Sequence, residues 1–249
     1  MFSMAKNIAA IICAAGSSRR FPGKRKKTFV DVAGRAVFVR SIELFANRDD
    51  VKQILLAIQP EDEEMVQIKW GANLKFFNVK ICFGGEERFE TVRKALELIK
   101  DNIDLVAVHD AVRCCVKKQW LNDCIAAAQK SGAAMLAAPV VATLKKVQNG
   151  SIVQTVDRTN LYEGQTPQVF DVKLLKDAYA NLKNLDSSKI SDDAMLLEAL
   201  GHKVSVVETD SSNIKITSGS DIAIAEAILK SRPSERPTKP IGPYEEAQW

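Results

Sequence analysis

Short apolar runs alternate with amphipathic segments along most of the chain. Five runs have the length and composition of buried strands: residues 7–13, 51–58, 80–83, 105–108 and 133–138. Four segments between them carry apolar residues at helical spacing: residues 35–45, 61–70, 87–100 and 119–130. Strands that alternate with helices predict a mostly parallel sheet covered by helices on both faces. Such sheets bind ligands at the carboxyl ends of their strands, so candidate chemistry is sought there.

The alternation of predicted strands and helices is interrupted between residues 139 and 170. Residues 143–147 and 152–156 are extended segments on either side of a Gln-Asn-Gly turn, which predicts a β-hairpin. A hairpin that interrupts the pattern is expected to form an extended arm that packs on another subunit. After the hairpin the alternation resumes. Helices are predicted at residues 172–181, 192–200 and 220–230, and strands at residues 203–207 and 213–217.

The length of 249 residues suits one large domain. We therefore predict one Rossmann-like α/β domain over residues 1–230, with the arm at about 139–170. The composition changes after Lys230, because residues 231–249 contain four prolines, several charges and few aliphatic side chains. This segment is predicted to be a disordered, Pro-rich tail.

Charge and cysteine content narrow the classes of partner and compartment. A net charge of only +4 does not demand a nucleic-acid partner. No apolar run approaches the roughly 20 residues that span a bilayer, and the first residues lack a signal-peptide pattern. The five cysteines are odd in number and form no CxxC pair, which favours free thiols in a reducing compartment. We expect a cytoplasmic protein without a nucleic-acid or membrane partner.

The first candidate for chemistry follows the first predicted strand. Ala14, Ala15 and Gly16 are small enough for a ligand to approach the backbone closely. Basic residues then accumulate: Arg19, Arg20, Lys24, Arg25, Lys26 and Lys27. This combination favours a phosphate-binding loop over its alternative, a solvated surface loop. The spacing matches neither a P-loop nor the dinucleotide GxGxxG motif, which argues against ordinary ATPases and nicotinamide-dependent dehydrogenases.

Three further segments carry isolated charges. Asp110 and Arg113 follow the strand at residues 105–108, and a lone carboxylate facing phosphates is a typical Mg²⁺ anchor, although it could equally cap the next turn. Arg158 could clamp an anion by bidentate hydrogen bonds, or form a surface pair with Asp157. Lys215 alternates with apolar neighbours in a predicted strand, where it could face a phosphate or protect a sheet edge.

Taken together and in order, these segments resemble the 2-C-methyl-D-erythritol 4-phosphate cytidylyltransferases of the non-mevalonate isoprenoid pathway. The resemblance extends from about residue 8 to about residue 229. Eight motifs carry it: Ala14-Ala15-Gly16 with Arg20 and Lys27; Gly84-Gly85-Glu86-Glu87-Arg88 with Thr91-Val92; His109-Asp110-Ala111 with Arg113; Ala138-Pro139-Val140 with Thr143; Thr155-Val156-Asp157-Arg158; Gln165-Thr166-Pro167-Gln168; Ser191-Asp192-Asp193-Ala194; and Asn213-Ile214-Lys215-Ile216-Thr217. No motif is decisive alone, but eight in this order are specific.

The resemblance implies a reaction in which a phosphate oxygen of methylerythritol phosphate attacks the α-phosphorus of CTP and pyrophosphate leaves. It implies that Arg20, Lys27 and Lys215 neutralise the triphosphate, and that Asp110 holds the cofactor Mg²⁺. The implied nucleotide-binding residues are Ala14, Ala15, Gly16, Gly84, Glu86 and Thr91. The implied acceptor-binding residues are Asp110, Arg113, Thr143, Arg158, Thr166 and Ser191. Thr143 and Arg158 would reach the partner's site through the arm, so the resemblance also implies a homodimer.

The chain departs from the family pattern at several positions. Ala142 stands where an acidic residue often precedes the threonine, Cys114 replaces a usual proline, and Ser191 replaces a threonine. None of these changes removes a charge that the chemistry needs. Three alternatives stay open from sequence alone: a ribitol 5-phosphate cytidylyltransferase, a nucleotide-binding regulatory module without turnover, and a nicotinamide-dependent reductase.

Overall fold

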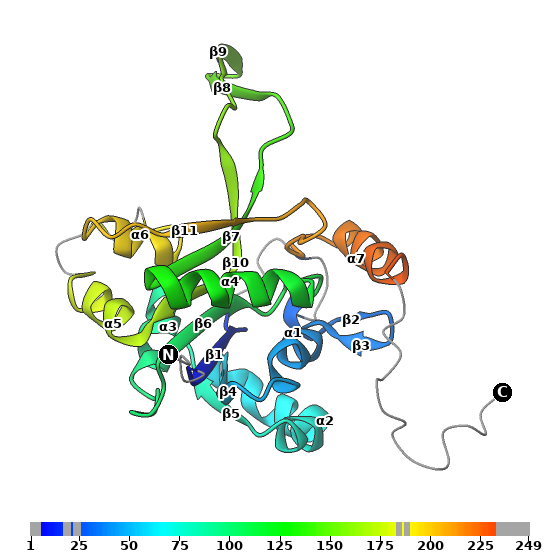
Figure 1. The fold of residues 1–249 in the computed structure, drawn as a ribbon. Coiled ribbons are helices and arrows are strands. Elements are labelled where there is room, and N and C mark those ends of the chain that lie inside the picture. Colours follow the sequence, from blue (N-terminus) through cyan, green and yellow to red (C-terminus); the bar gives the residue numbers. More distant parts are fainter. Residues whose placement is uncertain (1–5, 17–20, 22–25, 183–185, 187–189, 233–249) are drawn as a thin grey trace.

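The computed structural model describes residues 6–16, 21, 26–182, 186 and 190–232 (Figure 1). Its centre is a seven-stranded sheet in the order β11-β7-β10-β6-β1-β4-β5. The strands are β1 (Ile8–Cys13), β4 (Val51–Ile58), β5 (Val79–Phe83), β6 (Leu105–Asp110), β7 (Ala133–Pro139), β10 (Tyr162–Asp171) and β11 (Ser205–Glu208). Only β10 pairs antiparallel with its neighbours in this sheet, so the predicted mostly parallel α/β fold is confirmed.

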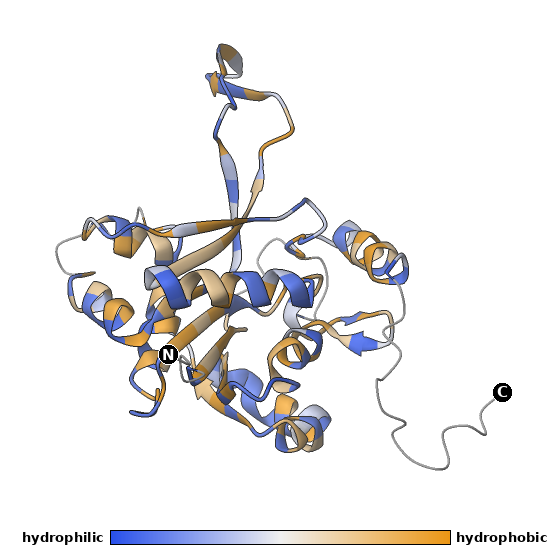
Figure 2. Ribbon diagram, in the orientation of Figure 1, coloured by the Kyte–Doolittle hydropathy of each residue, from blue (hydrophilic) through white to orange (hydrophobic). Residues whose placement is uncertain are grey.

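Helices cover both faces of the sheet, as the alternating pattern predicts. One face is covered by α1 (Val37–Ala46), α2 (Glu63–Phe76) and α4 (Lys118–Ser131). The other is covered by α3 (Arg88–Leu96), α5 (Val172–Ala180) and α6 (Asp193–Glu198). Strand β1 serves both cores, because successive side chains of a strand point to opposite faces: Ile8, Ala10 and Ile12 join one cluster, and Ala9 and Ile11 the other. Figure 2 shows hydrophobic residues concentrated along these central strands.

Several predicted boundaries differ from those observed, and at α1 the reason is local strand pairing. The helix predicted from residue 35 begins at Val37, because Arg35–Ala36 forms β3, which pairs with β2 (Asp31–Val32). The helix predicted at 87–100 ends at Leu96. Two short 3₁₀ turns, η1 (Lys27–Phe29) and η2 (Pro60–Asp62), were not predicted. The last helix, α7 (Ser220–Lys230), has its predicted bounds and packs against a smaller apolar cluster that includes Val32.

The arm is shorter than the predicted 139–170, because its last part is a central strand. Strand β10 lies between β6 and β7 and is buried from Gln165 to Phe170. Its Gly164 and Pro167 are residues that ordinarily interrupt strands, and a bulge between Gly164 and Gln168 accommodates them. These features conceal the strand in the sequence. The projecting part contains the predicted hairpin, formed by β8 (Leu144–Gln148) and β9 (Ser151–Val156) (Figure 1).

The predicted strand at residues 213–217 is wrong, since this segment has no regular secondary structure and joins no sheet. The Ile216 amide donates to Val112 O, and the Asn213 side chain donates to Gln165 Oε1 and Thr166 O. Side-chain hydrogen bonds therefore hold it where a ladder of backbone bonds was expected. Among the described helices, none is long and apolar enough to cross a membrane.

Candidate active site

A cleft of about 150 Å³ opens at the carboxyl ends of β1, β5 and β6. Seven of the residues predicted from sequence line it: Ala15, Gly16, Lys27, Glu86, Thr91, Asp110 and Lys215. They come from four separate parts of the chain. Sequence reasoning did not assign a role to the other lining residues, which include Cys13, Thr28, Gly85, Glu87, Arg88 and Val112.

The loops after β1 and β5 pack tightly against each other at one end of the cleft. Gln59 donates from one amide nitrogen to Ala15 O at 2.8 Å and to Gly85 O at 3.0 Å, so it ties the two loops together. A Cβ atom at Gly84 would lie 2.3 Å from the Ala15 Cβ and 2.8 Å from Thr91 Oγ1. Position 84 therefore needs glycine for close packing. The Thr91 hydroxyl, in turn, accepts the Gly85 amide at 3.0 Å.

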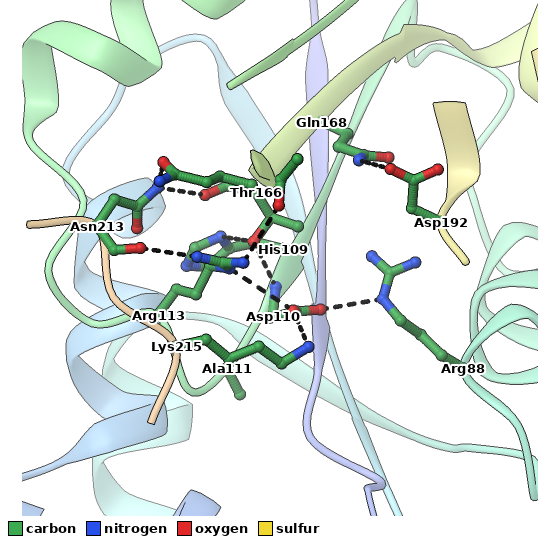
Figure 3. Close-up of polar contacts among 12 residues, drawn as sticks. Arg88, His109, Asp110, Ala111, Arg113, Thr166, Gln168, Asp192, Asn213 and Lys215 are labelled. Atoms are coloured by element: carbon green, nitrogen blue, oxygen red, sulfur yellow. Dashed lines mark hydrogen bonds and ion pairs between the residues drawn. The ribbon is translucent and has the colours of Figure 1, made fainter. Parts of the chain in front are cut away.

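Asp110 is the electrostatic centre of the site (Figure 3). Its Oδ1 accepts from Arg88 Nε at 3.0 Å, and its Oδ2 lies 2.7 Å from Lys215 Nζ and 3.8 Å from Arg113 Nε. Burial would raise the pKa of this carboxyl, but the charges of Arg88 and Lys215 hold it well below its usual range. Asp110 is therefore ionised at any physiological pH. The structure thus brings the three predicted site residues Asp110, Arg113 and Lys215 together.

Buried polar side chains on the interior side of the cleft hold Asp110 in place. Thr166 Oγ1 accepts the Asp110 amide at 3.0 Å and lies 2.9 Å from His109 Nδ1. Burial lowers the pKa of His109 to about 3, so the imidazole is neutral at physiological pH. Arg113 donates to Asn213 O at 2.7 Å and so fixes the segment that carries Lys215. Thr166 and Arg113 therefore lie behind the cleft and hold its residues in place.

Three predicted acceptor residues lie away from the cleft within one chain. Thr143 and Arg158 are exposed on the arm and are absent from the residues that line the cleft. Ser191 is exposed and lines an adjacent cavity of about 360 Å³, whose wall includes Glu87 and Arg88. Arg20, the remaining predicted catalytic residue, lies outside the described residues.

Arg88 is the main functional candidate that sequence reasoning missed. It occupies the first position of α3, between the N-cap Glu87 and Glu90, which together form a capping box. A cation there opposes the positive end of the helix dipole, which is unfavourable unless carboxylates compensate. An arginine at the start of a predicted helix could therefore have indicated nearby carboxylates. The structure shows two, because Asp110 and Asp193 both contact the guanidinium.

The site fits a metal ion that arrives together with phosphates. The described residues contain no cluster of three or more His, Cys, Asp or Glu side chains that could hold a metal alone. One carboxylate suffices for Mg²⁺, which keeps several waters and shares substrate phosphates. The ammonium of Lys215 now lies beside Asp110 Oδ2, so a positive charge is already stable at that oxygen.

The chain is similar to known proteins over nearly its whole length. The IspD family model, described as 2-C-methyl-D-erythritol 4-phosphate cytidylyltransferase, matches residues 8–231. A protein of that description from Endomicrobium trichonymphae is 40% identical over 225 residues, covering 90% of this chain and 99% of the relative. Another from Rhodopirellula baltica is 38% identical over 243 residues, covering 93% and 98%.

Solved structures agree with these relatives. The crystal structure of 4-diphosphocytidyl-2C-methyl-D-erythritol synthase from Anaerococcus prevotii has a TM-score of 0.77 at 30% identity, covering 91% of this chain and 97% of that one. The 2-C-methyl-D-erythritol 4-phosphate cytidylyltransferase of Thermus thermophilus has a TM-score of 0.74 at 31% identity, covering 91% and 100%. Sequence and fold therefore point to the same group of proteins.

Proposed function

The chain belongs to the 2-C-methyl-D-erythritol 4-phosphate cytidylyltransferase family, and from that premise we propose how its residues transfer CMP from CTP to methylerythritol phosphate. It is a nucleotidyltransferase of the non-mevalonate isoprenoid pathway. The attacking phosphate oxygen is already anionic, so the reaction needs no strong general base. Catalysis then depends on positioning the two substrates and on stabilising charge at the transferring phosphorus.

The nucleotide binds between the two tightly packed loops. The backbone at Ala14, Ala15 and Gly16 approaches the phosphates, while Gly84, Glu86 and Thr91 bind the base and ribose. Two observations support this placement of the nucleotide. Gly84 packs closely against Ala15, so the two loops are adjacent, and the neighbouring Gly16 is exposed. Backbone amides at such a loop suit phosphate oxygens.

Lys27 and Lys215, with Arg20, neutralise the triphosphate and the charge that develops as pyrophosphate leaves. The single observation that carries this proposal is the ion pair of Lys215 with Asp110 in a cleft also lined by Lys27. Asp110 would hold Mg²⁺, which would lower the negative charge of the phosphates. Lys215 faces the phosphate oxygens from the same cleft. Cations placed around the reacting phosphorus stabilise the transition state more than the ground state.

Thr143 and Arg158 bind the acceptor phosphate in the cleft of a second subunit, and the protein is a homodimer through the arm. Both side chains are exposed at a distance from their own cleft, and the hairpin also exposes Val147, Ile152 and Val153. An exposed apolar hairpin is what an interface between subunits would cover. Ser191 extends the acceptor site from the adjacent cavity. Thr166 and Arg113 contribute to it from behind the cleft, where they hold Asp110 and the segment of Lys215. The five cysteines are free thiols, in keeping with a cytoplasmic location.

The test of function is pyrophosphate release by the purified protein with Mg²⁺ and CTP, with and without methylerythritol 4-phosphate. Parallel reactions use ribitol 5-phosphate as acceptor and each of the other three nucleotides. We expect release only with CTP and methylerythritol phosphate together. Release with CTP and ribitol 5-phosphate, but not with methylerythritol phosphate, would show that the acceptor is ribitol phosphate. Absence of release with every pair of nucleotide and acceptor would contradict catalysis.

A further inference from the structure

Arg88 joins two buried carboxylates through two different nitrogen atoms. Its Nε donates to Asp110 Oδ1 at 3.0 Å, and its Nη1 donates to Asp193 Oδ2 at 2.6 Å. Both carboxylates are almost fully buried. Because buried carboxylates need compensating charge, a guanidinium between them neutralises both at once. Arg88 therefore connects the cleft, which it lines, with Asp193 at the start of α6, and Figure 3 shows its side chain directed at Asp110.

The far side of this junction is anchored in the hydrophobic core. Asp193, at the start of α6, accepts on its other oxygen from the Tyr179 hydroxyl at 2.5 Å. Tyr179 belongs to α5 and is buried. A continuous chain of polar contacts thus runs from Tyr179 through Asp193 and Arg88 to Asp110.

The contact to Oδ1 matters because a carboxylate rotates easily about its last bond. With Oδ1 held by Arg88, the second oxygen points to Lys215 at 2.7 Å and towards Arg113 at 3.8 Å. Without Arg88, both oxygens would be available to these two cations. Asp110 could then turn and contact Lys215 and Arg113 with both of its oxygens, in an orientation different from the one observed.

We propose that Arg88 is a positioning residue, which orients the Asp110 carboxylate for the reaction by fixing it to the buried Asp193–Tyr179 pair. The inference rests on the proposed role of Asp110. It adds that the orientation of Asp110 depends, through Arg88, on Asp193 and Tyr179 in the interior. Lysine cannot replace Arg88, because one ammonium lacks the rigid planar arrangement that reaches both carboxylates in fixed directions. Charge and geometry can therefore be separated by Arg88→Lys.

The first experiment compares steady-state kinetics of Arg88→Lys with the matched control Arg93→Lys, an exposed arginine on the same helix. We expect Arg88→Lys to lower kcat at least about tenfold while the KM for CTP changes less than about threefold, as for an interaction made in the transition state. Arg93→Lys should keep wild-type values. A kcat within about twofold of wild type for Arg88→Lys would overturn the proposal.

A double-mutant cycle excludes a merely structural role. Arg88→Gln is measured alone and in combination with Asp110→Asn. If Arg88 acts through Asp110, its substitution should lower kcat less than about twofold once Asp110 is already changed. An undiminished effect in that background would overturn the proposal, since general damage to the fold persists in both. If Asp110→Asn alone has normal kcat, the proposed function of Asp110 fails instead, which is a distinguishable result.

Discussion

The cleft and the arm present their functional side chains in opposite ways. Asp110 is 6% exposed and is held by contacts from four segments of its own chain. Arg158 is exposed on a hairpin that projects from the body of the molecule (Figure 1). Groups that are held rigidly before substrate arrives lose little conformational freedom on binding. The cleft is thus organised within one chain, whereas the side chains of the arm lie outside that cleft and are exposed.

The largest expected effect concerns the cleft. Lys215→Ala should lower kcat by at least about a hundredfold, because it removes one charge contact to the transition state. The measurement is pyrophosphate release at saturating CTP and acceptor, beside thermal unfolding of the same variant. An unfolding midpoint near that of wild type would show that the loss is catalytic. Near-normal turnover would remove Lys215 from the mechanism.

A smaller effect is expected at the arm, on binding of the acceptor. Arg158→Ala should raise the KM for methylerythritol phosphate about tenfold or more, the scale of a lost charged hydrogen bond, and leave the KM for CTP unchanged. An unchanged acceptor KM would contradict its assigned role.

Subunit mixing tests whether the arm acts across an interface. Co-refolded Arg158→Ala and Lys215→Ala chains should recover about a quarter of wild-type turnover, measured at an acceptor concentration well below the KM of Arg158→Ala. Half of a random mixture is heterodimer, and one of its two sites then carries neither change. Each variant refolded alone is the control. No recovery from the mixture would place Arg158 in its own chain's cleft.

The smallest expected effect concerns the buried imidazole of His109, next to Asp110. The pKa of His109 falls from its ordinary 6.5 to about 3 on burial, so between these values the unfolded chain binds a proton that the folded chain does not. His109 therefore makes the folded state less stable as pH falls from about 6.5 towards 3. In His109→Asn the unfolding midpoint should decline less steeply between pH 7 and 5. Equal slopes in the two proteins would contradict a neutral, buried His109.

The sequence predicted the fold well where pattern and burial coincide. The runs at β1, β4 and β6 are apolar because both faces of these strands are buried, so their composition alone identifies them. It failed at β10, where Gly164, Pro167 and buried polar residues form a central strand. Buried polar groups are tolerated there because partners satisfy them, such as Thr209 Oγ1 donating to Gln165 Oε1.

The candidate site divides in the same way. By itself the sequence determined which side chains follow the central strands, and so placed Gly16 and Asp110 among the chemical candidates. Lys215 became a candidate from its place in a predicted strand that the structure does not form. Only the tertiary structure decided that Arg88 joins Asp110 to Asp193, because these residues are 22 and 105 positions from Arg88 along the chain. Helical and strand periodicity report neighbours within a few residues. Contacts between distant segments depend on how the helices pack on the sheet, which local pattern does not encode.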